Sequence, residues 1–329
     1  MPDFVTMGEL LIDFVSSKKG CSVKDAPGFI PAPGGAPANV AVGIARLGGN
    51  VGFIGKVGRD PFGQKLEGVL KENRVDTAGL SFSDRARTML AFVSLTEEGE
   101  RDFVFYRHPS ADMFITEGDI PQGYLNGVRV FHFGSIGLIS EPSRGTTELL
   151  IKKAKNAGAL VSFDPNIRLS LWQDERRARD EIAAIIPQTD IVKLSRDEAL
   201  FITGIDHPKE AARMITAMGP RLAVVTMGAK GSVGVTARYG VEMEGFTVEV
   251  CDTTGAGDAF MAGMLVKIGE TGKRDLATLS DLELISIFSF ANAAGALTTT
   301  LLGAIPALPD RARVEEFLRT HKNRKRPLM

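Results

Sequence analysis

Short β-rich runs alternate with segments of helical periodicity along most of this chain of 329 residues. A strand that is followed by a helix and another strand usually returns to the same sheet in parallel, so helices cover both faces of that sheet. The pattern therefore predicts an α/β fold built on a parallel sheet. The β-rich runs are residues 51–54, 128–133, 160–163, 191–193 and 222–226.

Two parts of the chain depart from this rhythm. Residues 89–95 and 102–106 alternate apolar and polar side chains around the polar stretch 96–100, which is the pattern of a hairpin with one solvated face. Together with residues 16–33, this hairpin is expected to form a small β lid inserted into the first half of the chain. The predicted division is a core of residues 1–13, 35–86 and 108–329 and a lid of residues 14–34 and 87–107.

The composition limits the classes of partner. Hydrophobic residues make up 44% of the chain, enough for one large core or two modest ones. The 39 Lys and Arg nearly balance the 40 Asp and Glu, so no overall charge favours nucleic acid or an anionic membrane. Residues 284–308 carry no charge and could cross a bilayer, but Asn292, two glycines and Pro306 make a lipid-exposed helix costly. We therefore expect a helix buried in protein that runs into a loop.

The cysteines and histidines predict a reducing compartment and no structural zinc. Cys21 and Cys251 form no close pair, and the four histidines do not approach them at metal-ligand spacing. The N-terminus lacks a basic region followed by a small-residue cleavage site, so a secretory signal is not expected. Together these features predict a cytoplasmic protein.

The segment of residues 252–260 carries the strongest chemical signal, because it reads as a loop that opens into a helix. The N–H groups of Gly255, Ala256 and Gly257 could converge on an anion at the positive end of that helix. Asp258 follows in the first turn, where a carboxylate beside a phosphoryl group could accept the proton of an attacking hydroxyl. The alternative is that Asp258 only caps the helix.

The chain lacks both common phosphate-binding fingerprints, the G-x-x-x-x-G-K-[ST] loop and G-x-G-x-x-G after a strand. A nucleotide must therefore be held differently. The strand of residues 222–226 runs into a glycine turn at residues 227–231, and ligands often bind at such strand ends. The alternative is an ordinary turn at the end of a strand.

Polar groups near the N-terminus suit a polyol. Asp13 lies at the far end of an apolar strand, and Gly34 and Gly35 precede a helix that carries Asn39. Carboxylate and amide groups recognise neutral hydroxyls, and glycine allows close approach. The alternatives are a solvated strand end for Asp13 and a hydrogen bond at the helix start for Asn39.

Taken together, these segments resemble the ribokinase-like (pfkB-type) carbohydrate kinases, with matches from about residue 8 to residue 309. Residues 8–14, 105–112 and 162–168, with Leu171 and Trp172, are most similar to fructokinase signatures. The resemblance implies a ribokinase-like three-layer α/β/α core with a mostly parallel sheet and a β lid. It also implies transfer of phosphate from ATP to D-fructose, with Mg²⁺ and K⁺ as further cofactors.

The resemblance assigns roles to individual residues. Asp258 matches the catalytic base and Gly255, Ala256 and Gly257 match the anion hole. The residues that match sugar contacts of the family are Asp13, Gly34, Gly35 and Asn39. Two arginines, Arg107 and Arg168, resemble residues that reach the substrate or the transferred phosphate. Nucleotide contacts match Lys193, Ser195, Glu198, Thr226, Gly228, Gly231 and Asn292, with Glu198 organising Mg²⁺ through water and Ser195 replacing the usual Asn. The monovalent-cation site matches Asp252, Thr254, Thr298, Leu301 and Gly303, and Ala307 stands where some relatives have Ser.

Two rival functions remain open from the sequence. A kinase of the same fold that acts on 2-keto-3-deoxygluconate would use Arg107 and Arg168 for the carboxylate of its substrate. A catalytically inactive relative that binds sugar as a regulator is the rival from another class. The free edges of a hairpin lid also suggest a homodimer in which two lids cover each other.

Overall fold

The computed structural model describes residues 1–95, 101–321 and 325–327, and it confirms the α/β class. A ten-stranded sheet crosses the core in the order β14-β13-β12-β11-β10-β9-β8-β1-β4-β5, and the strands from β11 to β5 are parallel. The five predicted runs are β4, β8, β9, β10 and β11. The strands are β1 Phe4–Met7, β4 Val51–Gly58, β5 Leu80–Ser83, β8 Val130–Phe133, β9 Leu160–Phe163, β10 Ile191–Ser195, β11 Leu222–Thr226, β12 Ser232–Thr236, β13 Gly240–Met243 and β14 Lys325–Pro327.

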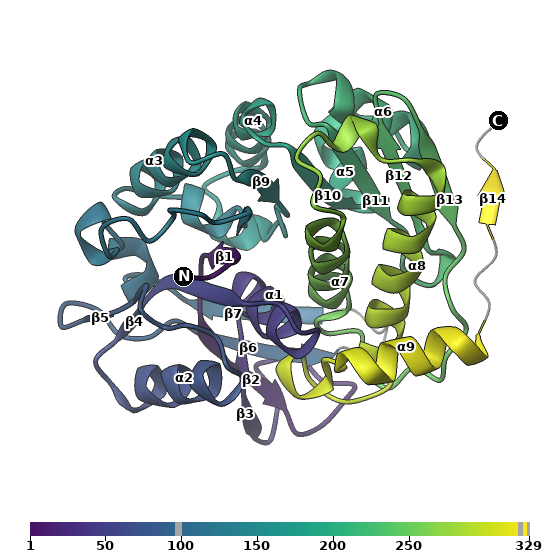
Figure 1. Ribbon diagram of the computed structural model, residues 1–329. Helices are drawn as coiled ribbons and strands as arrows, with labels where there is room; N and C mark the ends of the chain where they lie inside the picture. Colours follow the sequence, from purple (N-terminus) through teal and green to yellow (C-terminus); the bar gives the residue numbers. More distant parts are fainter. Residues whose placement is uncertain (96–100, 322–324, 328–329) are drawn as a thin grey trace.

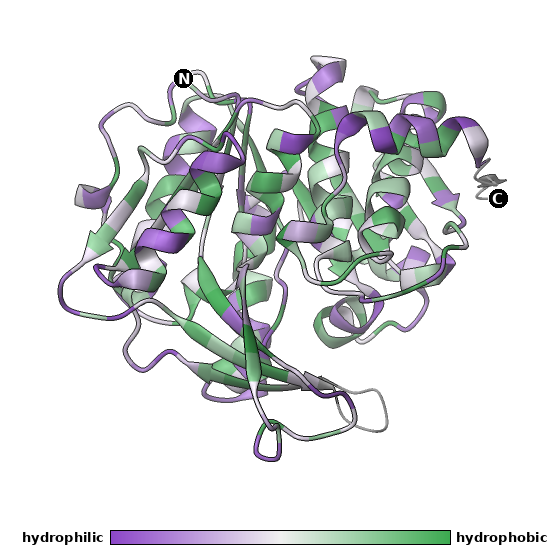
Figure 2. Cartoon of the chain, turned by 90° about the horizontal axis from the view of Figure 1, so that it is seen from below, coloured by the Kyte–Doolittle hydropathy of each residue, from purple (hydrophilic) through white to green (hydrophobic). Residues whose placement is uncertain are grey.

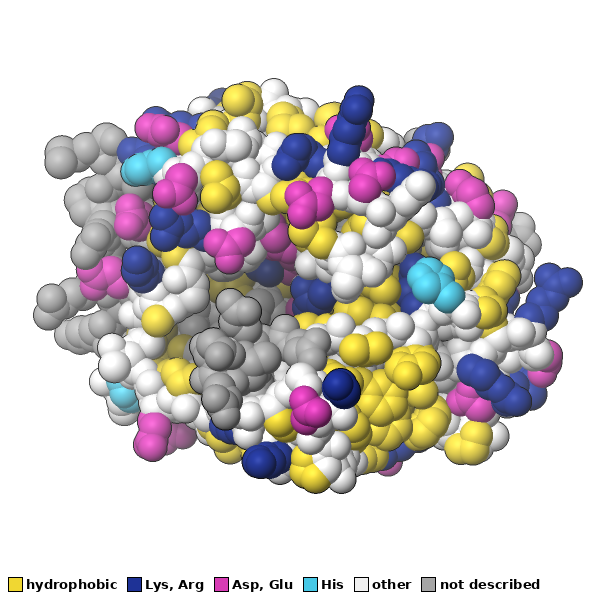
Figure 3. Space-filling model, turned by 180° about the vertical axis from the view of Figure 1, so that it is seen from behind, with side chains coloured by type: hydrophobic (Ala, Val, Ile, Leu, Met, Phe, Trp, Pro, Cys, Tyr) yellow, Lys and Arg dark blue, Asp and Glu magenta, His cyan; other side chains and the backbone are white. Residues whose placement is uncertain are grey.

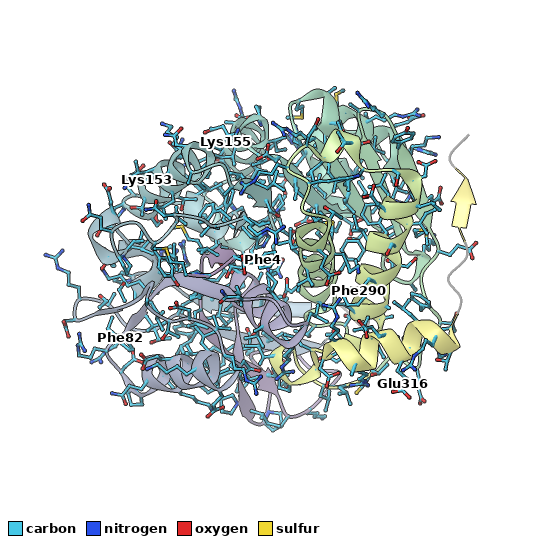
Figure 4. All side chains as sticks on the ribbon, in the orientation of Figure 1. Phe4, Phe82, Lys153, Lys155, Phe290 and Glu316 are labelled. Atoms are coloured by element: carbon cyan, nitrogen blue, oxygen red, sulfur yellow. The ribbon has the colours of Figure 1, made fainter. Side chains whose placement is uncertain are left out.

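Helices cover both faces of this sheet and make a three-layer core (Figure 1). Because side chains alternate along a strand, neighbouring residues of β1 enter different cores: Phe4 packs on one face and Val5 on the other. Figure 4 shows Phe4 in the middle of the molecule and Lys153 and Lys155 pointing outward. The Phe4 side holds α1 Ala36–Arg46, α2 Pro61–Glu72, α7 Ala256–Thr271, α8 Asp281–Thr298 and α9 Arg311–Thr320, and the Val5 side holds α3 Ser143–Asn156, α4 Glu175–Ile185, α5 Arg196–Thr203 and α6 Pro208–Ala217.

A smaller sheet of four strands forms the lid, in the order β3-β2-β6-β7. Its strands are β2 Leu11–Ser16, β3 Phe29–Gly34, β6 Leu90–Leu95 and β7 Arg101–Tyr106. β6 and β7 pair antiparallel as the predicted hairpin, whose turn at residues 96–100 lies outside the described residues. Figure 2 shows the lid strands projecting from the core.

The lid begins earlier than the sequence suggested. We expected Asp13 at the far end of a core strand, and this expectation was wrong, since β1 ends at Met7 and Asp13 lies within lid strand β2. The apolar run that contains both strands does not by itself reveal the break between them. The polar side chain of Asp13 is therefore carried by the lid rather than by the core.

Asp60 connects the base of the lid to the core. Its Oδ1 accepts a hydrogen bond of 2.9 Å from the amide of Gly63 and so caps α2, whose first residue is Pro61. Its Oδ2 accepts a second bond of 2.9 Å from the amide of Thr88, just before β6. One carboxylate thus fixes the start of a core helix against the entry to a lid strand.

The uncharged stretch of residues 284–308 is a buried helix followed by a loop, as expected. It begins within α8, whose capping box joins Ser280 and Glu283 and whose last residue is Thr298. Within the described ranges, no helix is long and apolar enough to span a membrane.

Candidate active site

A cavity of about 220 Å³ lies between the lid and the carboxyl ends of the core strands. The lid contributes Leu11, Asp13, Phe103 and Phe105 to its wall. The core contributes residues from six segments that are far apart in the sequence. The predicted site residues that line it are Asp13, Gly35, Asn39, Arg168, Lys193, Thr254, Gly255, Gly257 and Asp258.

Asp258 faces this cavity instead of capping its helix. α7 has Gly255 as its N-cap, in the left-handed conformation (φ 78°), and no side chain caps it. Asp258 Oδ2 accepts a hydrogen bond of 2.8 Å from Asn39 Nδ2 on the neighbouring helix α1. Burial raises the pKa of the Asp258 carboxyl, although the bond from Asn39 and the charges of Lys193 and Arg168 act in the opposite direction. Both simple alternatives, the helix cap and the helix-start bond of Asn39, are therefore wrong.

The glycine loop before Asp258 leaves no room for larger residues. A Cβ atom on Gly255 would lie 3.0 Å from Ala304 Cα, besides being strained by the positive φ. A Cβ atom on Gly257 would lie 3.1 Å from Lys193 Nζ. The ammonium group therefore sits close to the first turn of α7, where it adds positive charge to the helix N-terminus.

Lys193 forms a buried ion pair with Asp164. Asp164 lies in the predicted fructokinase-like segment of residues 162–168 but was not predicted as a site residue. Lys193 Nζ lies 2.7 Å from Asp164 Oδ2, and both side chains are less than a tenth exposed. Burial lowers the pKa of Lys193, but the carboxylates of Asp164, Glu198 and Asp258 outweigh it and raise that pKa overall. Burial raises the pKa of Asp164. The carboxyl of Asp164 thus holds the ammonium group of Lys193 in place at the cavity wall.

Glu198 is fixed by backbone amides on two sides. Its Oε1 accepts a bond of 2.7 Å from the amide of Ile167, and its Oε2 accepts one of 2.8 Å from the amide of Ser195. Ser195 Oγ in turn accepts from the amide of Glu198, so the two residues form a capping box at the start of α5. The helix cap explains why Ser is suitable at position 195. In the part of the chain that the structure describes, no three His, Cys, Asp or Glu side chains gather as a metal site.

The predicted nucleotide residues other than Lys193 lie outside the cavity wall. Ser195 at the end of β10 pairs with Thr226 at the end of β11. Gly228 and Gly231 have positive φ values of 57° and 99° in the turn that follows. Asn292 Nδ2 donates a bond of 3.1 Å to Ser232 Oγ just after this turn. Ser195, Thr226, Gly228, Gly231 and Asn292 therefore lie in or near this one turn.

The two predicted arginines lie in different places. Arg168 lines the cavity, with its guanidinium 5.6 Å from the centre of the Phe103 ring. Arg107 is fully buried and does not line the cavity, because Nε donates to Asp112 at 2.9 Å and Nη2 donates to the carbonyl of Ile136 at 3.1 Å. The structure therefore does not bring Arg107 to the substrate side, contrary to our expectation.

Close packing explains the glycine pair that precedes α1. A Cβ atom on Gly34 would lie 2.3 Å from Asp13 Oδ2, and one on Gly35 would lie 2.4 Å from the carbonyl oxygen of Glu9. Gly34 therefore packs beside the carboxylate of Asp13, while Gly35 lines the cavity. Glu9 also lines it, and the sequence analysis did not assign this residue although it falls in the quoted segment of residues 8–14.

The loop that contains Asp252 meets the loop that follows α8. Asp252 Oδ1 accepts bonds from the amide and the hydroxyl of Thr254, and Oδ2 accepts one of 2.9 Å from the amide of Gly303. The hydroxyl of Thr298 is used within α8, and the side chain of Leu301 is exposed. The structure thus brings Asp252, Thr254 and Gly303 together, while the side chains of Thr298 and Leu301 take no part in this contact.

Comparisons with known proteins agree with this geometry. A model of the pfkB family of carbohydrate kinases matches residues 1–311. A probable chloroplastic fructokinase of Arabidopsis thaliana is 48% identical over 96% of this chain and 82% of its own length, and fructokinase-2 of Zea mays is 45% identical over 95% and 93%. The ATP-bound fructokinase of Xylella fastidiosa has a TM-score of 0.88 at 33% identity, covering 97% of this chain and 99% of that one. A Vibrio cholerae O395 fructokinase double mutant with fructose, ADP and potassium bound has a TM-score of 0.86 at 36% identity, covering 96% and 98%. The chain belongs to the pfkB family of carbohydrate kinases.

Proposed function

We propose that this chain is an ATP-dependent fructokinase that converts D-fructose and ATP into fructose 6-phosphate and ADP. The hydrogen bond from Asn39 to Asp258 carries the proposal, because it holds a carboxyl of raised pKa in a cavity between the glycine loop and the lid. A general base works best when its pKa lies close to the working pH. The relatives named above are fructokinases, which supports fructose as the acceptor.

The proposed reaction is an in-line phosphoryl transfer. Asp258 takes the proton of the sugar hydroxyl while the hydroxyl oxygen forms a bond to the γ-phosphorus, and the bond from that phosphorus to the β–γ bridging oxygen of ATP breaks. The amides of Gly255, Ala256 and Gly257, with Lys193 beside them, supply positive potential for the phosphoryl oxygens. Asp13 and Asn39 orient the sugar, and the lid excludes water as a competing nucleophile.

Mg²⁺, when bound with ATP, neutralises phosphate charge. Glu198 suits a water-mediated contact with it, because an ionised carboxylate has about four acceptor positions and its two amide partners leave others free. The turn from Thr226 to Gly231 is the proposed place for the nucleotide, next to Ser195 on the same sheet edge. Of the two predicted arginines, Arg168 is the one that lines the cavity, and we assign the substrate contact to it.

Measurement of ADP release with fructose, glucose, ribose and 2-keto-3-deoxygluconate tests this function. We expect the highest kcat/KM with fructose. A preference for 2-keto-3-deoxygluconate would assign the chain to that rival kinase. No ADP with any acceptor, together with calorimetric binding of fructose, would indicate a regulator instead of an enzyme.

We also propose a monovalent-cation site between the loops that Asp252 joins, where it would stiffen the glycine loop of the anion hole. We expect kcat/KM for ATP to fall about tenfold when K⁺ is replaced by tetramethylammonium, the effect of roughly 1.4 kcal/mol of lost binding. Initial rates at constant ionic strength measure this. Equal rates in the two buffers would remove K⁺ from the cofactors.

A homodimer through the lid is a further part of the proposal. The face of the lid opposite the cavity gathers aromatic rings, with Phe14 stacked on Phe92 at 4.9 Å and Tyr106 62% exposed. Figure 3 shows hydrophobic side chains gathered in the lower part of the rear face of the molecule. Pro31 and Pro33 prevent edge strand β3 from extending a sheet, so the contact is expected on this apolar face.

Light scattering tests the dimer. We expect twice the chain mass of 35.3 kDa, and Tyr106→Asp should give the monomer mass because it places a charge in the apolar contact. Leu282→Asp is the matched control, since Leu282 is also exposed (77%) but lies on α8. A wild-type monomer would contradict the proposed contact.

The cytoplasm remains our proposed compartment. Among the described residues Cys21 and Cys251 are both free thiols, as a reducing environment allows. Fractionation of the source cells with an antibody against this chain would settle the compartment, and recovery in an organelle would contradict the proposal.

A further inference from the structure

Glu9 is a buried acid in the wall of the sugar cavity. It lies between β1 and β2, only 4% of it is exposed, and it lines the cavity together with Leu11 and Asp13. Its Oε1 accepts a hydrogen bond of 3.0 Å from the amide of Ala36, the first residue of α1. One oxygen of this carboxyl therefore fixes the start of the helix that carries Asn39.

The second oxygen of Glu9 has no such partner. Oε2 is buried and accepts no hydrogen bond from any described residue. A buried charged acceptor without a donor costs about 1–3 kcal/mol or more, so nearly all such atoms are paired in working proteins. Because Glu9 lines the cavity, we look to a ligand there for the missing donor.

The charges around Glu9 favour a neutral hydroxyl as that donor. Arg107 and Asp112 act on Glu9 with opposite signs, and they are paired with each other at 2.9 Å. Burial raises the pKa of Glu9 to about 7, which reflects a carboxyl without full solvation or compensation. An anionic ligand group would add repulsion, whereas a neutral hydroxyl can donate a hydrogen bond to the carboxylate without adding charge.

Glu9 and Asp258 are attached to the same turn of α1. Glu9 bonds the amide of Ala36, and Asp258 accepts from the side chain of Asn39, three residues later. A helix rises ~1.5 Å per residue, so the backbone positions of Ala36 and Asn39 differ by about 4.5 Å along the axis. A polyol with hydroxyls on successive carbons can therefore place one hydroxyl at Asp258 and offer another to Glu9.

We propose that Glu9 determines substrate specificity by accepting, through Oε2, a hydrogen bond from a sugar hydroxyl that is not phosphorylated. This role rests on the proposed kinase function, because the sugar is assumed to occupy the cavity that holds Asp258. It goes beyond that function by naming a contact that selects a hydroxyl-bearing carbon and rejects sugars that lack it.

Glu9→Gln separates this role from helix anchoring. Glutamine keeps an oxygen for the amide of Ala36, but it replaces the second oxygen by an NH₂ group that cannot accept. We expect KM for fructose to rise by roughly 10- to 100-fold, the effect of losing a hydrogen bond to a charged group. The turnover number at saturating fructose and the melting temperature should stay close to those of the wild type, and Glu9→Asp should recover part of the affinity.

Fructose analogues that each lack one hydroxyl provide the decisive test. For the wild type, one analogue should bind more weakly than fructose, by the same factor by which Glu9→Gln weakens the binding of fructose. The Glu9→Gln variant should bind that analogue no more weakly than the wild type does. Additive losses for every analogue, or a fall in melting temperature with unchanged KM, would overturn the role of Glu9. Dissociation constants from calorimetry give the same comparison without turnover. An inactive wild type would therefore contradict the kinase function, while these constants would still show whether Glu9 binds the hydroxyl.

Discussion

Replacement of Asp258 by Asn should lower kcat by roughly 10²- to 10⁴-fold, the usual contribution of a general base. Asparagine has nearly the same shape, and its amide oxygen can still accept the bond that Asn39 donates at 2.8 Å. The variant therefore keeps the contact between α1 and α7 and loses only the proton acceptor. Steady-state rates of ADP release with fructose measure the loss.

The matched control for this variant is sugar binding. Calorimetry should give nearly the same affinity for fructose in Asp258→Asn and in the wild type, because Asp13, Asn39 and the rest of the cavity wall are unchanged. A turnover number close to that of the wild type would reject Asp258 as the base. A large loss of affinity would instead mean that Asp258 mainly binds the ground state of the sugar.

Replacement of Asp164 by Ala should reduce the free energy of unfolding by about 3–5 kcal/mol, as is typical when one partner of a buried ion pair is removed. The side chain of Lys193 is only 7% exposed, and its ammonium group would lose the carboxylate 2.7 Å away. Glu198 and Asp258 also favour its charge, which places the expected loss toward the lower end of the range. Urea unfolding of the purified variants measures this loss.

The double variant Lys193→Met with Asp164→Leu is the control for that experiment. Two apolar side chains of similar volume replace the pair without leaving a buried charge, so most of the lost stability should return. Activity should remain low in the double variant, because the cation beside Gly257 is absent. If Asp164→Ala were as stable as the wild type, the ion pair would contribute little to the fold.

The sequence predicted local structure well because local patterns determine it. The alternation of strands and helices, the hairpin of β6 and β7, and the buried α8 all follow from periodicity and end signals within short segments. Asp258 and its glycine loop were also recognisable, since they are contiguous in the chain.

Contacts between distant segments could not be predicted in the same way. The segment of residues 8–14 reads as the continuation of one apolar strand, so the break between β1, which ends at Met7, and β2, which begins at Leu11, was not visible, nor was the place of Asp13 in the lid. The family resemblance suggested a substrate contact for Arg107, but Asp112 and the carbonyl of Ile136 bind this side chain inside the protein. Glu9 was overlooked because an acid between two strands gives no local sign that it will be buried.

The bond between Asn39 and Asp258 spans 219 positions of the chain. During synthesis a ribosome releases α1 long before α7, and domains generally take shape as units once their segments have emerged. A partly made chain thus has half of a sugar pocket and no proton acceptor in it. Catalytic competence should appear only when the final quarter of the polypeptide has docked, which makes enzyme activity a sensitive reporter of complete folding.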